Sequence, residues 1–307
     1  VVIDRDGKTR KGKILQVMGY QGLQRIEVEN ATAGSIVCIT GVDKLNISDT
    51  VCDPIRVEAL PPLSVDEPTV RMTFQVNDSP FAGREGKFIT SRNIKERLDK
   101  ELISNVALRV QQGDSPDKFI VSGRGELHLS VLIETMRREG FELAISKPEV
   151  IQKEVDGEIH EPYEHIVIDI EDIHQGSIME ELGPRKAEIQ NIESDNNGRI
   201  KLEFLAPSRG IIGLKNQLLT ATAGEAILSH RFLDFRPIKG GIPERLNGSL
   251  VSMEKGLAIP YSIDKLQDRG KFFVNPGEEI YEGQVIGENS RGDDMVINIT
   301  KTKKLSN

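Results

Sequence analysis

The stretch Gly83-Arg84-Glu85-Gly86-Lys87-Phe88 contains the residue types from which phosphate-binding loops are built. In a nucleotide-binding loop of this kind, a glycine stands five residues before the Gly-Lys pair, and a Ser or Thr follows the lysine to contact magnesium. Here those two positions hold Phe81 and Phe88. We therefore interpret the stretch as a structural or RNA-facing loop with Arg84 and Lys87 exposed.

Histidines and carboxylates gather in one part of the chain and raise the question of a metal site. They are His160, His165 and His174 with Glu161, Glu164, Glu171 and Asp172. Their spacings match no compact zinc or di-metal pattern, and the cysteines, Cys38 and Cys52, form no CxxC pair. We predict no metal site. We also predict no catalytic residues, because no nucleophile, base and orienting acid converge in the sequence.

The charge of the chain is unevenly distributed. The net charge of −8 argues against attraction of the whole protein to nucleic acid. Residues 153–182, however, hold ten acidic residues against Lys153, whereas residues 205–245 hold six basic against three acidic residues. Residues 80–100 are likewise six to three in favour of the basic residues. Local basic clusters can therefore bind phosphate groups on an acidic protein.

Arg209 is the leading candidate for phosphate binding. It follows Pro207-Ser208 at an expected helix start, where backbone N–H groups and a guanidinium can meet one phosphate. Arg269 and Lys271 flank a glycine that allows close backbone approach. The full set of predicted RNA or ribosome contacts is Arg84, Lys87, Arg92, Arg209, Lys215, Arg236, Lys239, Arg269, Lys271, Lys301, Lys303 and Lys304. We expect alanine at Arg209, Lys215, Lys303 and Lys304 to leave the fold intact, because exposed cations contribute little to stability.

Turn signals and hydrophobic periodicity predict an α+β protein of four segments. Residues 1–63 contain short strands separated by turns, which indicates a partial β-barrel. Residues 64–150 follow the order βαββαβ: strands at 70–76, 106–110, 119–122 and 141–145, with helices that begin near Ser91 and Gly125. Ser91 is the expected N-cap, and Gly140 the expected end of the second helix.

The same order recurs in residues 151–237, with a capping box at Ser177 and a further helix that starts at Ser208. We therefore predict two ferredoxin-like βαββαβ sandwiches in tandem, with both helices on one face of each sheet. Residues 238–307 show turn signals and no helical periodicity, which predicts a C-terminal all-β domain. No apolar run is long enough to cross a bilayer, and the sparse cysteines suit a reducing cytoplasm.

Several stretches resemble the BipA/TypA family of translational GTPases. They are 79–88 (SPFAGREGKF) with the following TSR, 122–129 (SGRGELHL), 136–141 (MRREGF), 207–210 (PSRG) and 266–271 (LQDRGK). The SGRGELH type of sequence is also similar to elongation factor G and LepA, whereas 79–88 and 266–271 point to the BipA/TypA family itself. The resemblance covers essentially all 307 residues.

This resemblance implies a ribosome-binding region that contacts rRNA, and possibly tRNA, near the A site and assists large-subunit assembly and stress adaptation. The GTPase domain, with its GTP and magnesium, is then expected upstream of Val1, so this part itself needs no cofactor and catalyses nothing. The C-terminal domain is expected to be cut short at its end. One departure is Leu214-Lys215, where the family pattern has an aromatic residue and an arginine; the positive charge is kept.

Two other classes of function fit the same sequence. Tandem βαββαβ units also build ligand-sensing domains, with sites between sheets. A protein-interaction module is the second alternative, in which the acidic 153–182 surface binds a basic ribosomal protein. The second alternative is compatible with RNA binding elsewhere on the chain.

Overall fold

The structure is a computed structural model that describes residues 1–43, 45–63, 67–195, 197–242 and 247–302. The chain forms two compact units, Val1–Asn77 with Ala82–Ile151 and Asp78–Phe81 with Gln152–Asn307, and each is described by itself. Of the helices in the described ranges, none is both long and apolar enough to span a membrane.

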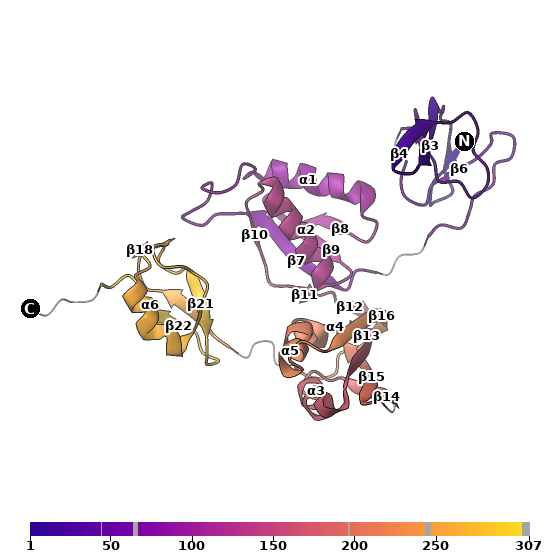
Figure 1. Ribbon diagram of the computed structural model, residues 1–307. Helices are drawn as coiled ribbons and strands as arrows, with labels where there is room; N and C mark the ends of the chain where they lie inside the picture. The colour runs from indigo at the N-terminus through magenta and orange to yellow at the C-terminus, as the bar shows by residue number, and fades with distance from the viewer. Residues whose placement is uncertain (44, 64–66, 196, 243–246, 303–307) are drawn as a thin grey trace, which may run out of the picture. The chain divides into compact units, whose positions relative to one another are not determined.

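The first 63 residues form two small antiparallel sheets (Figure 1). One has the order β2-β1-β6, from Thr9–Arg10, Val2–Ile3 and Thr50–Val51. The other has the order β4-β3-β5, from Gln24–Glu27, Gln16–Gln21 and Cys38–Thr40. The described strands close no barrel. Val2 and Ile3 are buried, whereas Leu23, Ile36 and Ile55 are almost fully exposed.

The next sheet belongs to the first compact unit and follows the predicted order of elements. These are β7 (Val70–Val76), α1 (Ser91–Ser104), β8 (Arg109–Gln112), β9 (Lys118–Gly123), α2 (Glu126–Glu139), β10 (Leu143–Ile145) and β11 (Glu149–Val150). The strand order is β10-β7-β9-β8 with antiparallel pairing throughout, and β11 also pairs with β7. Both helices pack on the same face of the sheet, since Leu98 of α1 and Leu129 of α2 share one core with Phe74.

The start of α1 and the end of α2 lie at or within one residue of the predicted positions. The N-cap of α1 is Thr90, whose hydroxyl accepts from Asn93 N at 3.3 Å, so the prediction of Ser91 is wrong by one residue. Gly140 ends α2 in the left-handed conformation with φ of 93°, as predicted, because glycine adopts this conformation without a side-chain clash.

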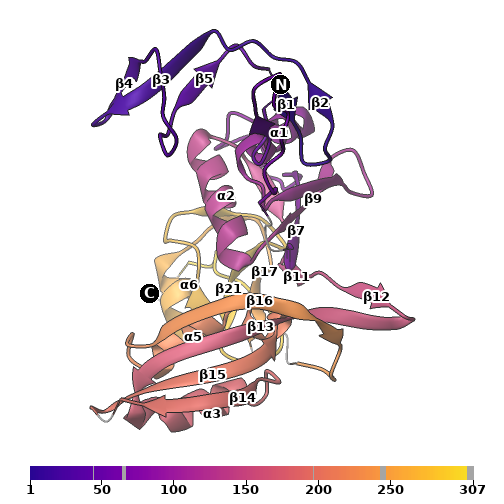
Figure 2. The same cartoon turned by 90° about the vertical axis from the view of Figure 1, so that its right-hand side faces the viewer.

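The sheet formed by residues 153–237, in the second compact unit, repeats this arrangement. Its elements are β12 (Lys153–Val155), β13 (Glu158–Glu171), η1 (Asp172–His174), α3 (Gln175–Leu182), β14 (Glu188–Ser194), β15 (Arg199–Pro207), α4 (Ser208–Ile211), α5 (Leu214–Ala221) and β16 (Ile227–Pro237). The long strands β16, β13 and β15 lie side by side with β14 at the edge (Figure 2), in the order fourth, first, third, second that the first sheet also has. Ile178 of α3 and Leu218 of α5 share one core with Ile168, so both helices again cover one face.

Two helix predictions in this sheet were wrong. The capping box at Ser177 does not form, because the chain already turns helically at Asp172–His174 and α3 begins at Gln175 without a side-chain cap. The single helix expected from Ser208 is two helices, α4 and α5, which are interrupted by Gly213 in the left-handed conformation with φ of 71°.

The C-terminal part is not all-β, which corrects the prediction. Its elements are β17 (Ser249–Ser252), β18 (Gly256–Leu257), α6 (Pro260–Leu266), η2 (Gln267–Arg269), β19 (Gly270–Phe272), β20 (Glu279–Ile280), β21 (Val285–Asn289) and β22 (Met295–Ile297). The sheet order is β19-β21-β17-β22, in which β17 and β22 run parallel. Helix α6 has Pro260 in its first turn and packs Ile263 and Leu266 on the core. Two apolar positions are too few for a helical periodicity to be visible in the sequence.

Candidate nucleic-acid interface

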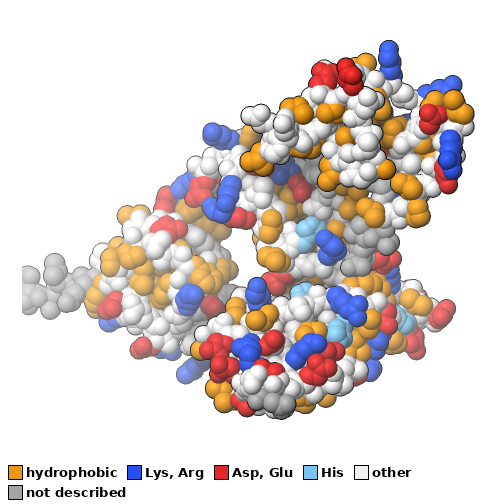
Figure 3. All heavy atoms as spheres, turned by 45° about the vertical axis from the view of Figure 1, so that its right-hand side comes forward, with side chains coloured by type: hydrophobic (Ala, Val, Ile, Leu, Met, Phe, Trp, Pro, Cys, Tyr) orange, Lys and Arg blue, Asp and Glu red, His pale blue; other side chains and the backbone are white. Residues whose placement is uncertain are grey.

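Charged side chains of both signs are mixed on the surface. On the face seen in Figure 3, basic and acidic side chains lie interspersed, and no broad basic area is visible there. A phosphate-binding site on this protein therefore has to be a small cluster whose cations are not already paired with neighbouring carboxylates.

Arg209, the leading candidate, is engaged inside the protein. Its Nε donates to Glu161 Oε2 at 2.5 Å, and one terminal nitrogen donates to Glu161 Oε1 at 3.1 Å and to Gly240 O at 2.6 Å. The side chain of Glu161 has no exposed surface, and that of Arg209 is 23% exposed. The expectation of an exposed Arg209 is wrong, because the buried carboxylate needs a charged partner. Phosphate binding by Arg209 stays a prediction.

A second buried glutamate lies next to this pair. Glu164 Oε1 accepts from Ser208 Oγ at 2.5 Å, and Glu164 Oε2 lies 2.5 Å from His230 Nδ1. The hydrogen bond to Glu164 raises the pKa of His230, while burial opposes the shift. Helix α4 is thus held to β13 by two carboxylates, so Ser208 and Arg209 fix the helix on the sheet.

Two other predicted contacts, Arg236 and Lys239, carry carboxylate partners. Arg236 Nε lies 2.8 Å from Asp234 Oδ1, and its guanidinium lies 5.4 Å from the centre of the Tyr163 ring. Lys239 Nζ lies 2.9 Å from Glu188 Oε1. Both pairs lie at the surface, where an approaching phosphate can compete with the carboxylate.

The remaining predicted cations are more accessible. Arg92 pairs with Glu96 at 2.8 Å on the exposed side of α1. Lys215 and Lys301 are exposed, and neither has an ion-pair partner among the residues that the structure describes. Arg84 and Lys87 are exposed in the loop before α1. Lys303 and Lys304 lie outside the described residues.

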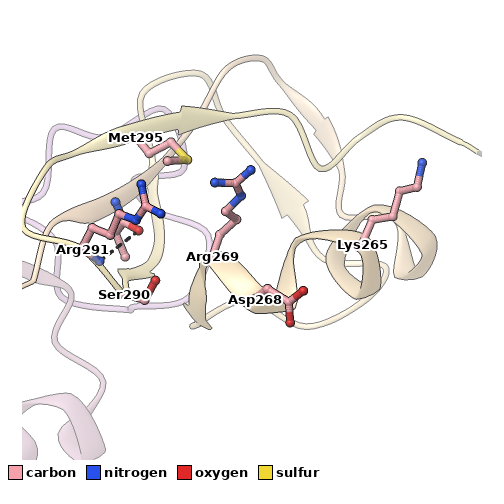
Figure 4. Close-up of a pocket in the computed structure, with 7 residues that line it drawn as sticks. Lys265, Asp268, Arg269, Ser290, Arg291 and Met295 are labelled. Carbon is pink, nitrogen blue, oxygen red and sulfur yellow. Dashed lines mark hydrogen bonds between the residues drawn. The ribbon is translucent and has the colours of Figure 1, made fainter.

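The C-terminal unit contains a basic pocket of about 370 Å³. It is lined by Lys265, Asp268, Arg269, Asn289, Ser290, Arg291 and Met295. The guanidinium groups of Arg269 and Arg291 extend on the same side as Met295, whereas the carboxylate of Asp268 points away from them (Figure 4). Three cations therefore line this pocket with a single acid, and neither arginine has an ion-pair partner within the described part of the chain.

Hydrogen bonds of the backbone and of Asn289 fix the segments that line the pocket. Ser290 N donates to Arg269 O at 2.8 Å, which joins η2 to the end of β21. The buried Asn289 accepts from Arg291 N at 3.3 Å and donates to Asp293 O at 2.6 Å. Lys271 lies on β19 with its side chain exposed and does not line the pocket. Lys265 and Arg291 are not among the contacts predicted from the sequence. Lys265 stands four residues before Arg269, but only sheet pairing brings Arg291 near.

One group of potential metal ligands also forms. Glu171, His174 and Glu225 each offer a ligand atom, and these atoms lie within 4.8 Å of one another. The positive charge of Arg199 lies close enough to interact with both carboxylates. Exposed acidic groups are common without an ion, so the prediction of no metal site stays a prediction.

Two parts of the chain match known protein domains. Residues 158–246, which include β13 to β16 with the helices α3 to α5, match the elongation factor G C-terminus, a domain of a translational GTPase. Residues 247–307 match the TypA/BipA C-terminal domain.

Whole-chain relatives agree with these two domains. The chain is 55% identical over 307 residues to the "Large ribosomal subunit assembly factor BipA" of Haemophilus influenzae, of which it covers 50%. It is 54% identical to the protein of that name in Escherichia coli and 48% identical to the one in Synechocystis, and it covers 51% of each. The chain is thus similar over its whole length to proteins of the TypA/BipA family, and it spans about half the length of these curated relatives.

Proposed function

We propose that this chain is the ribosome-binding region of a cytoplasmic translational GTPase that assists large-subunit assembly and the response to stress. Similarity over the whole chain to proteins named large ribosomal subunit assembly factors supports the proposal. In the complete protein, GTP and magnesium would be bound by a domain outside this chain. The 307-residue sequence contains no GxxxxGK[ST] loop, which supports the proposal that its own role is binding and not GTP hydrolysis.

We also propose that the antiparallel sheets of residues 70–150 and 153–237, with their helices, are ferredoxin-like sandwiches that dock through the sheet face left open by the helices. The common strand order, fourth-first-third-second, supports this assignment, as does the packing of both helices on one face. In the first sheet the alternation of side chains places Arg71, Arg109 and Lys118 on the open face. A negatively charged partner would compete with Glu149 for Arg71, at 3.2 Å, and with Asp114 for Lys118, at 3.3 Å.

The basic pocket is the observation that best supports the proposed contact with RNA. Each guanidinium can donate two parallel hydrogen bonds to a phosphate, and two guanidiniums on one side of a pocket can bind one phosphate or two neighbouring ones. Within the described residues neither arginine forms an ion pair, so a ligand phosphate would not have to displace a carboxylate from either one. We propose that Arg269, Arg291 and Lys265 bind backbone phosphates of rRNA or of A-site tRNA.

Cosedimentation with purified large subunits over a salt series tests this proposal. Replacement of Arg269 and Arg291 by Ala should make the negative slope of log K against log salt shallower by about 0.7 to 0.9 for each phosphate that the variant no longer binds. The matched control is Lys255→Ala, an exposed cation of the same C-terminal part that lies 3.7 Å from Glu279. Equal slopes for the wild type and the double variant, with normal melting of both, would place the ribosome contact elsewhere.

A further inference from the structure

A carboxylate occupies the centre of the loop that resembles a phosphate-binding loop. Glu142 Oε1 accepts from Gly83 N at 2.7 Å and from Asn77 Nδ2 at 2.8 Å. Glu142 Oε2 accepts from Gly86 N at 2.9 Å and from Glu85 N at 3.2 Å. Three backbone N–H groups of one short loop thus converge on a single carboxylate, as they converge on phosphate in anion-binding nests. The loop binds an anion, and the anion is a side chain of the same compact unit.

The loop is shaped for this carboxylate. A Cβ on Gly86 would lie 2.4 Å from Glu142 Cβ and 2.9 Å from Glu142 N, so only glycine allows the loop to approach β10 this closely. Gly83 has a φ of 79°, which side-chain-bearing residues rarely adopt. The hydrogen bonds from Gly86 N and Gly83 N lower the pKa of Glu142 to about 2, so the group is a carboxylate at neutral pH.

The far end of the loop is also tied to the segment that precedes β10. Lys87 N and Phe88 N both donate to Gly140 O, at 2.8 and 3.1 Å, and Glu142 N donates to Phe88 O at 3.1 Å. The rings of Phe88 and Phe141 lie 4.7 Å apart. These hydrogen bonds fix the loop backbone, and with it the positions from which the exposed side chains of Arg84 and Lys87 extend.

We propose that Glu142 is the positioning residue of this loop: it is the internal anion around which residues 83–86 fold, and it thereby holds Arg84 and Lys87 in place to contact ribosomal RNA. The contact itself rests on the proposed function. If Glu142 positions the loop, removing its charge should change RNA affinity in the direction opposite to that expected from charge alone. Removal of a negative charge beside two cations should strengthen RNA binding if charge alone matters. It should weaken binding if the carboxylate organises the loop.

Hydrogen exchange of the 307-residue chain tests the positioning role without the ribosome. In Glu142→Gln the amides of Gly83, Glu85 and Gly86 should exchange about tenfold faster or more, because they lose hydrogen bonds to a charged acceptor. Glu142→Asp keeps the charge and should fall between Glu142→Gln and the wild type. The matched control is Glu149→Gln, which removes an exposed carboxylate of the same sheet that pairs with Arg71. Unchanged exchange of the three amides in Glu142→Gln, with the core amides of α1 and α2 protected in every variant, would overturn the proposal.

Cosedimentation with large subunits tests the consequence. Glu142→Gln should bind more weakly than the wild type, and its negative slope of log K against log salt should be shallower by up to about 1.8 if neither cation binds a phosphate any longer. Glu149→Gln should bind as well as the wild type or more tightly. In an Arg84→Ala/Lys87→Ala background, Glu142→Gln should have no further effect, since its action runs through these cations. Tighter binding by Glu142→Gln would overturn the proposal. Failure of the wild type itself to bind would instead overturn the proposed function, and the hydrogen exchange would then decide alone whether Glu142 organises the loop.

Discussion

Arg209 and Glu161 form a two-point ion pair in which the side chain of Glu161 is fully buried and that of Arg209 only 23% exposed. The pair joins the single turn of α4 to the N-terminal part of β13, and Arg209 extends the connection to Gly240 O. A cation that the sequence presents as a ligand-binding residue is therefore also a structural residue. Stability and RNA binding have to be measured separately for any variant at this position.

Arg209→Ala should destabilise the chain by about 3 kcal/mol, because it leaves the carboxylate of Glu161 buried without its partner. Urea denaturation of the wild type and the variant measures the difference. Lys215→Ala is the matched control: its side chain is exposed and should change the free energy of unfolding by no more than about 0.5 kcal/mol. If Arg209→Ala unfolds at the same urea concentration as the wild type, the ion pair contributes nothing to stability.

His230 should make stability depend on pH near neutrality. Its pKa is raised by the hydrogen bond to Glu164, so the folded state holds the proton more tightly than the unfolded state. This contribution is fully present below the unfolded pKa of about 6.5 and is lost as the pH rises through the higher folded value. The difference in melting temperature between the wild type and His230→Gln should accordingly shrink as the pH rises above about 6.5. A difference that grows with pH would mean that the proton is not shared with Glu164.

Gly270→Ala should destabilise the C-terminal part by about 1 to 3 kcal/mol, through steric overlap. A Cβ at this position would lie 1.9 Å from Glu288 O, where β19 pairs with β21 beside the basic pocket. Gly176→Ala in α3 is the control, since a Cβ there meets nothing within 4 Å. Chemical denaturation distinguishes the two, and equal stability would show that β19 can move away from β21 at no cost.

Removal of divalent metal should leave the chain unchanged. The group Glu171, His174 and Glu225 is close to Arg199, and a nearby cation reduces the need for a metal ion. Melting in EDTA should match melting in buffer, and Zn²⁺ at micromolar concentration should not raise the melting temperature. A rise with Zn²⁺ that disappears in Glu225→Gln would establish a metal site at these residues.

The sequence by itself determined the elements whose signal is local. The alternation of apolar residues in 70–76 defined β7, and Gly140 marked the end of α2, because strand alternation and left-handed glycine depend on the nearest neighbours alone. The order βαββαβ and its repetition followed from these signals. The predicted cap at Ser177 was wrong because the chain is already helical before this residue. Helix α6 was not predicted because its few apolar residues show no periodicity.

Only the tertiary structure decided which charged groups meet. Arg209 and Glu161 are separated by 48 residues, Glu142 lies 59 residues from Gly83, and Arg291 reaches Arg269 only because β21 pairs with β19. The sequence shows that a cation is present and not whether a buried carboxylate has already bound it. The reason is physical: the interaction of two charges depends on their separation and on their exclusion from water, and strand pairing sets both across long stretches of chain.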